Sequence, residues 1–379
     1  MKRSADIVVI GGGVVGCSIA YQLARMGQRN VVIVEKNQVA SGASGRCPGG
    51  FRQQWSTRAD ILLMSASIRM FTQLQDELEY PGDLEIRQIG YLFLSYNEDE
   101  MGQFRKNVEL QRSLGVPVDV LGPQDAKSLV PFLDVSNVVG GTFCPLDGRG
   151  SPLMVTHAYA TAAKRLGVEL NTDTRVTGLI TSDGRMTGVV TDRGTIEAPA
   201  VVTVAGTHTR DIARMLGIEL PIRPSRREAM ITEKFDRPQV PALMSENLGY
   251  FQTPDGDFLP DMRPPDVETL DISGTRGFLS RTATAWAKVL PPLAGVRIVR
   301  HWAGYYDMTP DAHPIVGSLP GTEGFYVAAG FSGHGFMMAP IIGKAMAEML
   351  LGLPSSIDIS ELQADRFARG GHAAEVMVY

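Results

Sequence analysis

Apolar and polar positions in the first 36 residues follow the order strand, helix, strand. Residues 7–10 are a short run of mostly branched apolar side chains, which is typical of a buried parallel strand. Over residues 14–26 the apolar side chains recur at helical spacing, and Gly27 ends that pattern. Residues 31–34 form a second apolar run of the same kind. The pattern therefore predicts two neighbouring parallel strands joined by a helix.

The middle of the chain predicts a small β-meander. Residues 174–206 hold short strand-like runs that are interrupted by the turn pairs Asp183-Gly184 and Arg193-Gly194. The last of these runs, residues 201–205, is expected to return to the parallel sheet.

Four further stretches predict local structure. Residues 84–95 alternate like a strand, and residues 99–115 have the spacing of an amphipathic helix. The pair Ser151-Pro152 provides an N-cap followed by a proline at the first helical position. The proline-rich residues 254–265 are expected to form a loop.

Near the C-terminus, residues 324–330 predict a strand of the sheet. An amphipathic helix is expected from Ala339 onward, with Lys344 and Glu348 paired one turn apart on its polar side. Between the two lies "GFSGHGFMM", in which glycines leave the backbone bare. Glycines in that position favour a ligand that presses against the main chain.

Composition limits the function. The chain has 379 residues with 44% hydrophobic content, enough for about two domains, and its net charge of -5 gives no reason to expect nucleic acid as a partner. Three cysteines form no disulfide framework, which fits a cytoplasmic protein. We expect no metal site, since no ligand spacing occurs, and no membrane span, since no apolar run is long enough.

The motif Gly11-x-Gly13-x-x-Gly16 lies between the first strand and the helix. Gly11 permits a tight turn, Gly13 lets a pyrophosphate approach the backbone, and Gly16 lets the helix pack closely on the strand. Helix N-terminal amides favour the phosphate charge, and Glu35 at the end of the second strand can accept hydrogen bonds from a ribose. These residues predict a dinucleotide site.

Three features favour FAD over NAD as the dinucleotide. Residues 39–55 form a Ser/Gly-rich loop with Arg46 and Arg52 that could wrap a pyrophosphate and reach a flavin ring. The β-meander is the second feature, by resemblance rather than by spacing, because flavoproteins that bind two dinucleotides have such a crossover. The third is the glycine-rich stretch at residues 328–340, where a helix N-terminus could stabilise negative charge on a reduced flavin. His334 in that stretch is interpreted as either catalytic or structural. An NAD-only dehydrogenase is the weaker alternative.

The chain resembles the D-amino-acid-oxidase-like FAD-dependent oxidoreductases. Within that family it is most similar to β subunits of heteromeric sarcosine oxidases and to dye-linked L-proline dehydrogenases. The resemblance spans residues 6–340, and its stretches are "DIVVIGGGVVGCSIAYQLA", "GGFRQQW", "IGYLFLSYNEDE", "WAGYYDMTPDAHPIVG" and "AAGFSGHGFMMAP".

The resemblance implies an α/β (α+β) fold of the glutathione-reductase type, as in sarcosine oxidase. A Rossmann-like FAD-binding domain would be combined with a discontinuous mixed-sheet substrate domain. We expect the FAD-binding domain to comprise residues 1–85, 145–220 and 301–379. The substrate domain would comprise residues 86–144 and 221–300.

The implied reaction is oxidation of a C–N bond in a secondary or N-methyl amino acid, such as proline or sarcosine, by hydride transfer to FAD to give an imine. The electron acceptor would be a dye, a quinone or O2. The alternatives are an O2-using glycine or D-amino acid oxidase and a non-catalytic subunit that only holds FAD. The resemblance also implies a larger α subunit as a partner, with FMN held at the interface.

The family's site residues carry over to matching positions here. Arg52, His334 and Met337 are the catalytic candidates, and Arg52 is also expected to bind the substrate carboxylate because guanidinium pairs bidentately with it. Tyr250, Tyr305 and Tyr306 are expected to line the substrate pocket, with packing in the core or at the surface as the alternative for each. The cofactor-binding candidates are Gly11, Gly12, Gly13, Val14, Val15, Gly16, Glu35, Lys36, Ser41, Ser44, Arg46, Val176, Ala205, Gly206, Gly304, Gly330, Ser332, Gly333, His334, Gly335, Phe336 and Met337.

Two departures from the family pattern change the expectation. Monomeric sarcosine oxidases attach FAD through a cysteine where this chain has Gly304, so non-covalent FAD is expected here. They also carry a lysine after "GHGF", where this chain has Met337. The missing cation favours a dehydrogenase over an oxidase.

Overall fold

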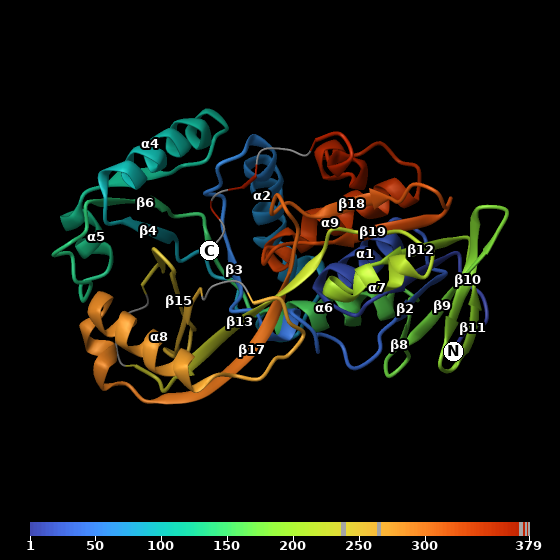
Figure 1. Cartoon of the computed structure of the whole chain (residues 1–379), viewed down its shortest axis with the longest axis horizontal. Helices are drawn as coiled ribbons and strands as arrows, with labels where there is room; N and C mark the ends of the chain where they lie inside the picture. The colour runs from blue at the N-terminus through green and yellow to red at the C-terminus, as the bar shows by residue number, and fades with distance from the viewer. Residues whose placement is uncertain (236–239, 264–266, 371–373, 376, 378–379) are drawn as a thin grey trace.

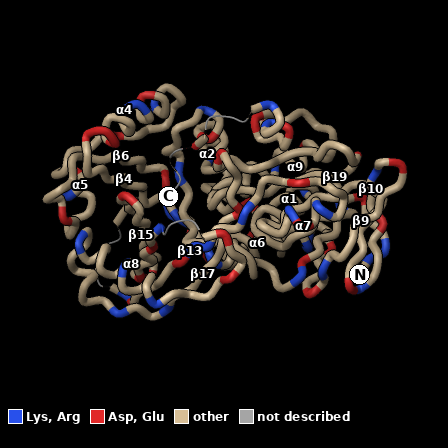
Figure 2. The backbone as a smooth tube through the Cα atoms, in the orientation of Figure 1, with Lys and Arg blue, Asp and Glu red and all other residues tan. Residues whose placement is uncertain are grey.

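The computed structural model describes residues 1–235, 240–263, 267–370, 374–375 and 377. Figure 1 shows two lobes side by side, with the long strands β13 (Arg223–Thr232) and β17 (Ile298–Met308) running from one lobe towards the other. Figure 2 shows acidic and basic residues interspersed over both lobes, which agrees with the nearly balanced charge of the chain.

A six-stranded sheet forms the centre of the first lobe. Its strand order is β18-β19-β12-β1-β2-β8. Strands β19, β12, β1, β2 and β8 are parallel to one another, and β18 pairs antiparallel with β19. All residues of β1 and β2 are buried, as the unbroken apolar runs predicted. The strands are β1 (Ile7–Ile10), β2 (Val31–Val34), β8 (Glu169–Asn171), β12 (Ala200–Thr203), β18 (Ile315–Ser318) and β19 (Phe325–Ala329).

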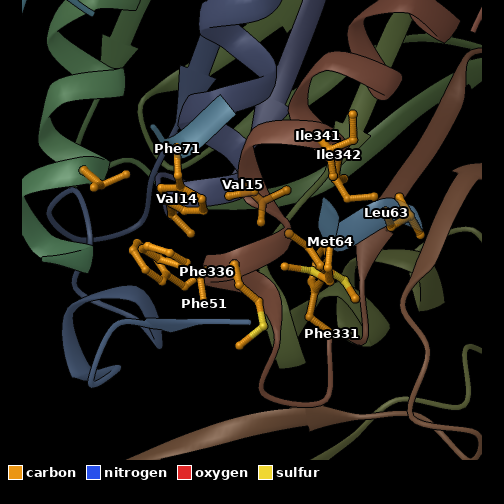
Figure 3. Close-up of a cluster of buried hydrophobic side chains, with 14 of the residues drawn as sticks. Val14, Val15, Phe51, Leu63, Met64, Phe71, Phe331, Phe336, Ile341 and Ile342 are labelled. Atoms are coloured by element: carbon orange, nitrogen blue, oxygen red, sulfur yellow. The ribbon is translucent and has the colours of Figure 1, made fainter. Parts of the chain in front are cut away.

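Helices α1 (Val14–Arg25) and α9 (Gly335–Leu350) pack against each other beside this sheet (Figure 1). Their close approach depends on Gly343, where an added Cβ would lie 2.0 Å from the Ser18 hydroxyl oxygen. The helices α2 (Arg58–Phe71) and α6 (Pro152–Arg165) complete this layer. Figure 3 shows side chains of α1, α2 and α9, together with Phe51 and Phe331, converging on one buried cluster. In it, the Phe71 ring lies 4.9 Å from that of Phe51 and 5.3 Å from that of Phe336.

The predicted β-meander is confirmed. Strands β9 (Val176–Ser182), β10 (Arg185–Thr191) and β11 (Gly194–Glu197) form an antiparallel three-stranded sheet, and the next strand, β12, returns to the six-stranded sheet. The turn between β9 and β10 contains Asp183 and Gly184, both with positive φ.

An eight-stranded mixed sheet forms the second lobe, in the order β17-β13-β16-β15-β14-β4-β6-β5. Strand β4 pairs parallel with β14, and the other described pairs are antiparallel. The helices α4 (Glu98–Ser113), α5 (Pro123–Leu129) and α8 (Arg276–Val289) lie in this lobe (Figure 1). Its remaining strands are β4 (Tyr91–Ser95), β5 (Asp119–Leu121), β6 (Gly140–Cys144), β14 (Ala242–Ser245), β15 (Leu248–Gln252) and β16 (Phe258–Met262).

The short elements join the larger ones. A two-stranded ladder pairs β3 (Gly50–Phe51) with β7 (Gly148–Arg149). Within the described ranges, the remaining helical pieces are α3 (Leu74–Glu77), α7 (Thr209–Arg214) and 3₁₀ turns at Ser44–Arg46, Gly206–His208, Pro291–Gly295, Ser360–Leu362 and Ala364–Phe367.

Two local predictions are confirmed by their caps. Helix α4 begins after Asn97, whose side chain accepts a hydrogen bond from the backbone N–H of Glu100. Helix α6 begins after Ser151, whose hydroxyl accepts from the N–H of Met154, and Pro152 is its first residue.

Four local predictions need correction. The strand expected over residues 84–95 is only β4, and it is buried on both faces. The C-terminal helix begins at Gly335, four residues before Ala339. Residues 335–338, which were expected to precede the helix, form its first turn. The ion pair expected within this helix is present, with Lys344 Nζ 2.9 Å from Glu348 Oε1, but Glu348 is buried rather than on an open polar face.

The loop expected over residues 254–265 is wrong for its central part, which forms β16. Pro260 lies inside this strand, opposite Tyr250 of β15. Proline has no backbone N–H to donate to a neighbouring strand. β16 pairs with β15 over five positions but with β13 at the single pair Ala229–Asp261. The edge of β16 that faces β13 therefore needs few backbone donors, and a proline is tolerated there. Residues 264–265 of that prediction lie outside the described residues.

The two-domain division stays a proposal. The six-stranded sheet draws its strands from the segments assigned to the FAD-binding domain, and the eight-stranded sheet draws most of its strands from the other segments. Strand β17 crosses the boundary expected at residue 301, and all of its pairs are with β13 in the eight-stranded sheet. We propose that the substrate domain extends through Met308 of this strand.

Candidate functional site

A cavity of about 690 Å³ lies between the two sheets. Its walls come from the start of α1, the end of β2, the loop after β2, the start of α9, and the strands β13, β16 and β17. This volume is within the ~300–1,000 Å³ range of small-molecule and cofactor sites.

The glycine motif forms the turn at one end of the cavity. Gly11 has φ +124°, and an added Cβ there would lie 2.5 Å from the carbonyl oxygen of Val204. At Gly16 an added Cβ would lie 2.1 Å from the Gly11 carbonyl oxygen. Gly13 is the N-cap of α1, so the first turn of that helix presents its backbone amides next to a residue without a side chain. The turn therefore has the shape and dipole that a pyrophosphate requires.

Glu35 is fixed beside this turn. Its Oε2 accepts a hydrogen bond of 2.7 Å from the N–H of Gly12, and its Oε1 accepts one of 2.8 Å from the N–H of Asn37. The carboxylate thus lies at the end of β2 and lines the cavity, where a ribose hydroxyl could donate to it.

The loop after β2 folds back over the glycine turn. Ser44 Oγ accepts a hydrogen bond of 3.0 Å from the N–H of Val14. The Arg46 guanidinium donates to the carbonyl oxygens of Ser41 and Gly42, and its own carbonyl accepts 3.0 Å from the indole N–H of Trp302. Arg46 thereby connects the loop to β17 of the other sheet.

A second bare stretch of backbone forms the opposite end of the cavity. Gly333 has φ +95°, and an added Cβ would lie 2.4–2.8 Å from three ring carbons of Tyr306. His334 is the N-cap of α9, and Gly335 and Phe336 of its first turn line the cavity. A helix N-terminus therefore points its amides and positive dipole end at the cavity, as the sequence predicted.

The sheet side of the cavity carries charge. Arg227 and Asp261 line it together with Tyr306 and Asp307. Burial raises the pKa of Asp261 to about 6, opposed by a hydrogen bond from the backbone N–H of Gly249 and by the neighbouring Arg227. Burial likewise raises the pKa of Asp307 to about 6, opposed by hydrogen bonds from backbone amides that include the N–H of Gly330 at 2.7 Å.

Most of the expected site residues meet at this cavity. Those that line it are Gly11, Gly13, Val14, Val15, Glu35, Lys36, Ser41, Ser44, Arg46, Val176, Ala205, Gly206, Gly304, Tyr305, Gly333, Gly335 and Phe336. The structure places the others behind the lining: Gly12, Gly16, Arg52, Tyr250, Gly330, Ser332, His334 and Met337. Their predicted roles stay predictions.

Arg52 lies in a buried polar region rather than on the cavity wall. Its guanidinium donates 2.7 Å to the carbonyl oxygen of Gln54 and also to that of Met377, and it stacks 3.8 Å from the ring centre of Trp55. The C-terminal segment is held there by Glu375, whose carboxylate accepts from the Ser56 hydroxyl at 2.6 Å. Sequence could not place Arg52, because its partner Met377 is 325 residues away.

His334 and Met337 are buried beneath the start of α9. The His334 ring meets Trp55 edge-on at 4.4 Å, and neither ring nitrogen has a hydrogen-bond partner among the described residues. Burial, with the nearby Arg52 charge, lowers the pKa of His334 to about 3, so the ring is neutral near pH 7. The carbonyl oxygen of Met337 accepts a 2.6 Å hydrogen bond from Ser67 Oγ.

Tyr250 belongs to the core of the second lobe. Its ring lies 4.8 Å from that of Phe258 and 5.3 Å from that of Trp286. Tyr305, in contrast, lines the cavity opposite His208, whose ring is 6.3 Å away.

Sequence reasoning missed Arg227, Asp261, Trp302 and Asp307. No motif marks the first two, because they are brought together only by strand pairing. Asp307 does lie in the recognised stretch "WAGYYDMTPDAHPIVG", and its place at the end of a strand was a signal that could have been used.

These features fit an FAD molecule. The glycine turn and Glu35 suit its adenosine diphosphate half, and the cavity continues from them to the glycine-bare start of α9. Among the described residues, no group of three or more His, Cys, Asp or Glu side chains is placed to hold a metal ion. In the same part of the chain, no helix is both long and apolar enough to cross a membrane.

Comparisons with known proteins agree with this geometry. Residues 6–349 match the family described as "FAD dependent oxidoreductase". The chain is similar to sarcosine oxidase subunit beta of an Arthrobacter species, with 28% identity over 97% of this chain and 92% of that protein. Human mitochondrial sarcosine dehydrogenase is 26% identical, over 93% of this chain and 40% of that protein.

Two solved structures resemble this chain along nearly its whole length. L-proline dehydrogenase from P. horikoshii has a TM-score of 0.93 and 35% identity, covering 98% of this chain and all of that one. Glycine oxidase from Geobacillus kaustophilus has a TM-score of 0.90 at 24% identity, covering 96% of this chain and 99% of that one, and shows that the fold is shared.

Proposed function

Because the chain belongs to the FAD dependent oxidoreductase family, as its motifs indicated, we propose that it oxidises the C–N bond of a secondary or N-methyl amino acid to an imine. The observation that carries this proposal is the continuous cavity that joins the glycine turn of α1 to the N-terminus of α9. The similarity to a proline dehydrogenase structure at 35% identity supports the substrate class.

When bound, FAD supplies the acceptor for two electrons and a proton. The residues of the chain bind and orient it. Backbone amides of Gly13 and Val15 would hold the pyrophosphate, since the Val14 amide donates to Ser44 Oγ, and Glu35 would accept from the ribose. The amides at the start of α9 would stabilise negative charge on the reduced ring. Phe336 and Phe331 give this end of the cavity apolar walls that exclude water.

We propose that a dehydrogenase acceptor, a dye or a quinone, takes the electrons in preference to O2. His334 is neutral near pH 7, and Met337 stands where related oxidases carry a lysine, so the first turn of α9 supplies no side-chain cation. The Arg227 guanidinium on the opposite wall would be paired with the substrate carboxylate. A cation held beside the flavin would stabilise negative charge that develops during its reaction with oxygen.

Reduction of the flavin by substrate tests the function. The visible spectrum of the purified protein should show flavin bands, and anaerobic L-proline, sarcosine or dimethylglycine should bleach them. The proposal fails if none of these three compounds bleaches the bands while glycine or a D-amino acid does. A chain that holds FAD and is bleached by no amino acid would be the non-catalytic subunit instead. Oxygen uptake during turnover separates oxidase from dehydrogenase.

We also propose that the chain assembles with a larger subunit. The support is its similarity, over nearly its whole length, to proteins named as beta subunits of sarcosine oxidase. Native mass spectrometry of protein purified from its source would show an added larger chain. Chromatography of the extracted flavins would show whether FMN accompanies FAD.

A further inference from the structure

One face of the eight-stranded sheet carries the charged side chains of the cavity. Opposite each other across strands β13 and β17 are Ser225 and Tyr306, and also Arg227 and Gly304. On β13, Ala229 lies two residues beyond Arg227 and is paired with Asp261 of β16. Paired residues and residues two apart on one strand share a face. Arg227 and Asp261 therefore project to the same side, as diagonal neighbours.

Small residues surround this pair on the same face. Arg227 is opposite Gly304, while Asp261 lies between Ala229 and Gly249. An added Cβ at Gly249 would be only 2.3 Å from Asp261 Oδ1, so the carboxylate extends over the space that this glycine leaves. Both charged side chains therefore have room beside them and line the cavity.

The geometry holds the Arg227 guanidinium in a defined place. Arg227 Nη1 donates 2.7 Å to Ser225 Oγ and 3.0 Å to the carbonyl oxygen of Arg226, and its guanidinium carbon lies 5.1 Å from the ring centre of Tyr306. These contacts fix the guanidinium on the cavity wall next to the Gly333 end, since Tyr306 also packs against Gly333.

We propose that Arg227 and Asp261 form the subsite for the zwitterionic part of an amino acid substrate, with Arg227 binding the carboxylate and Asp261 the ammonium group. The proposal rests on the proposed function and assigns to this pair the recognition that sequence had given to Arg52. A guanidinium pairs bidentately with a carboxylate, and a carboxylate is the natural acceptor for an ammonium. A site with both charges selects amino acids over simple carboxylic acids and over amines.

Asp261 is also placed to take a proton. An ammonium cannot release a hydride from its neighbouring carbon until it is neutral. The N–H bond would break and an O–H bond would form on Asp261, which becomes a neutral acid. With the nitrogen neutral, its lone pair would be free to form the C=N bond, and bound FAD would supply the acceptor for the hydride and its two electrons. Burial raises the pKa of Asp261 to about 6, which makes it a stronger base than an exposed aspartate.

Binding of ligands that cannot be oxidised tests the subsite apart from turnover. α-Aminoisobutyrate has no hydrogen on its α-carbon, and isobutyrate is the same compound without the amino group. Calorimetry of the FAD-loaded protein would measure both affinities. Hydrogen bonds between charged groups are worth roughly tenfold or more in affinity. Arg227→Met should weaken both ligands by about ten- to hundredfold.

Asp261→Asn should behave differently. It should weaken α-aminoisobutyrate by about tenfold or more and leave isobutyrate unchanged or tighter, since a negative charge is removed. The control is Arg226→Met: Arg226 is on the opposite face of β13, with its guanidinium 3.6 Å from Asp271, and is expected to change neither affinity. If Arg227→Met does not fold, Arg227→Lys takes its place in the test. Lysine keeps the charge but cannot bind a carboxylate bidentately, so the affinity for both ligands should fall several-fold.

A pH profile adds a readout that a purely structural role would not change. Among the described residues, the titratable and charged groups near Asp261 include Arg227, Tyr91, Tyr306 and Cys47, and Arg263 lies near Tyr306. Near pH 7 Asp261 is ionised, so the affinity for α-aminoisobutyrate should fall as the pH drops below about 6. Asp261→Asn should abolish that fall.

The outcomes separate this inference from the proposed function. If amino acids bleach the flavin but Arg227→Met, Arg227→Lys and Asp261→Asn retain both affinities, the subsite is wrong and the function stands. If the variants weaken binding as expected but no amino acid bleaches the flavin, the function is wrong and the subsite stands. Wild-type protein that binds neither ligand also overturns the subsite.

Discussion

The Gly333→Ala substitution would perturb the end of the cavity that we assign to the flavin ring. Gly333 has φ +95°, a conformation that costs an alanine roughly 1–2 kcal/mol. The new Cβ would also lie 2.4–2.8 Å from three ring carbons of Tyr306, and overpacking of this kind costs typically ~1–3 kcal/mol. Together the two effects predict a loss of about 2–5 kcal/mol in the free energy of unfolding.

Gly217→Ala is a matched control for this substitution. Gly217 has φ +71°, and an added Cβ there would meet no atom within 4 Å. Gly217→Ala should therefore lower the free energy of unfolding by about 1–2 kcal/mol, through the backbone conformation alone. Urea denaturation of the FAD-loaded proteins would measure both losses, and FAD titration of the stripped proteins would measure cofactor affinity. We expect weaker FAD binding for Gly333→Ala only, because Tyr306 and the start of α9 must shift. Equal losses and equal FAD affinities in the two variants would refute the reasoning.

Three further substitutions test other parts of the site. Glu35→Gln weakens the acceptor for the ribose and for the N–H of Gly12, so FAD affinity measured by fluorescence titration should fall by about tenfold; an unchanged affinity would contradict the role of Glu35. Gly249→Ala places a Cβ 2.3 Å from Asp261 Oδ1 and should weaken α-aminoisobutyrate more than isobutyrate; equal effects in calorimetry would count against the subsite. Asp307→Asn removes a carboxyl whose pKa is raised from 3.8 to about 6. The stability that this carboxyl contributes is full below about pH 4 and is lost as the pH rises to 6. The variant should therefore gain thermal stability relative to wild type between pH 4 and pH 6. A difference in melting temperature that stays constant over this interval would contradict the prediction.

The parts of the site that depend on local sequence could be predicted. Gly11, Gly13 and Glu35 lie in one short strand–helix–strand unit, whose spacing fixes their arrangement. The bare stretch around Gly333 was recognisable for the same reason, since glycine spacing and the following helix are local features. Within this stretch, the helix start was misplaced, at Ala339 instead of Gly335. Glycine occurs both in turns and in the first turn of a helix, so the sequence does not show which conformation Gly335 adopts.

The parts that depend on strand pairing could not be predicted. Arg227 and Asp261 are 34 residues apart in sequence and meet only because Ala229 pairs with Asp261. Pro260 made this strand look like a loop, which hid the carboxylate next to it. Arg52 had the chemistry of a carboxylate-binding residue, but its position depends on a carbonyl near the C-terminus. A register shift of one residue in β16 would turn Asp261 away from the cavity, and no local signal fixes that register.

The central claim is that FAD extends from the glycine turn of α1 to the start of α9. A crystal structure of the chain with FAD bound tests it most directly. We predict that the pyrophosphate lies at Gly13–Val15 and that the isoalloxazine ring lies against Gly333–Phe336, facing Arg227 and Asp261. A ring found outside the cavity, or pyrophosphate bound away from the N-terminus of α1, would contradict the account.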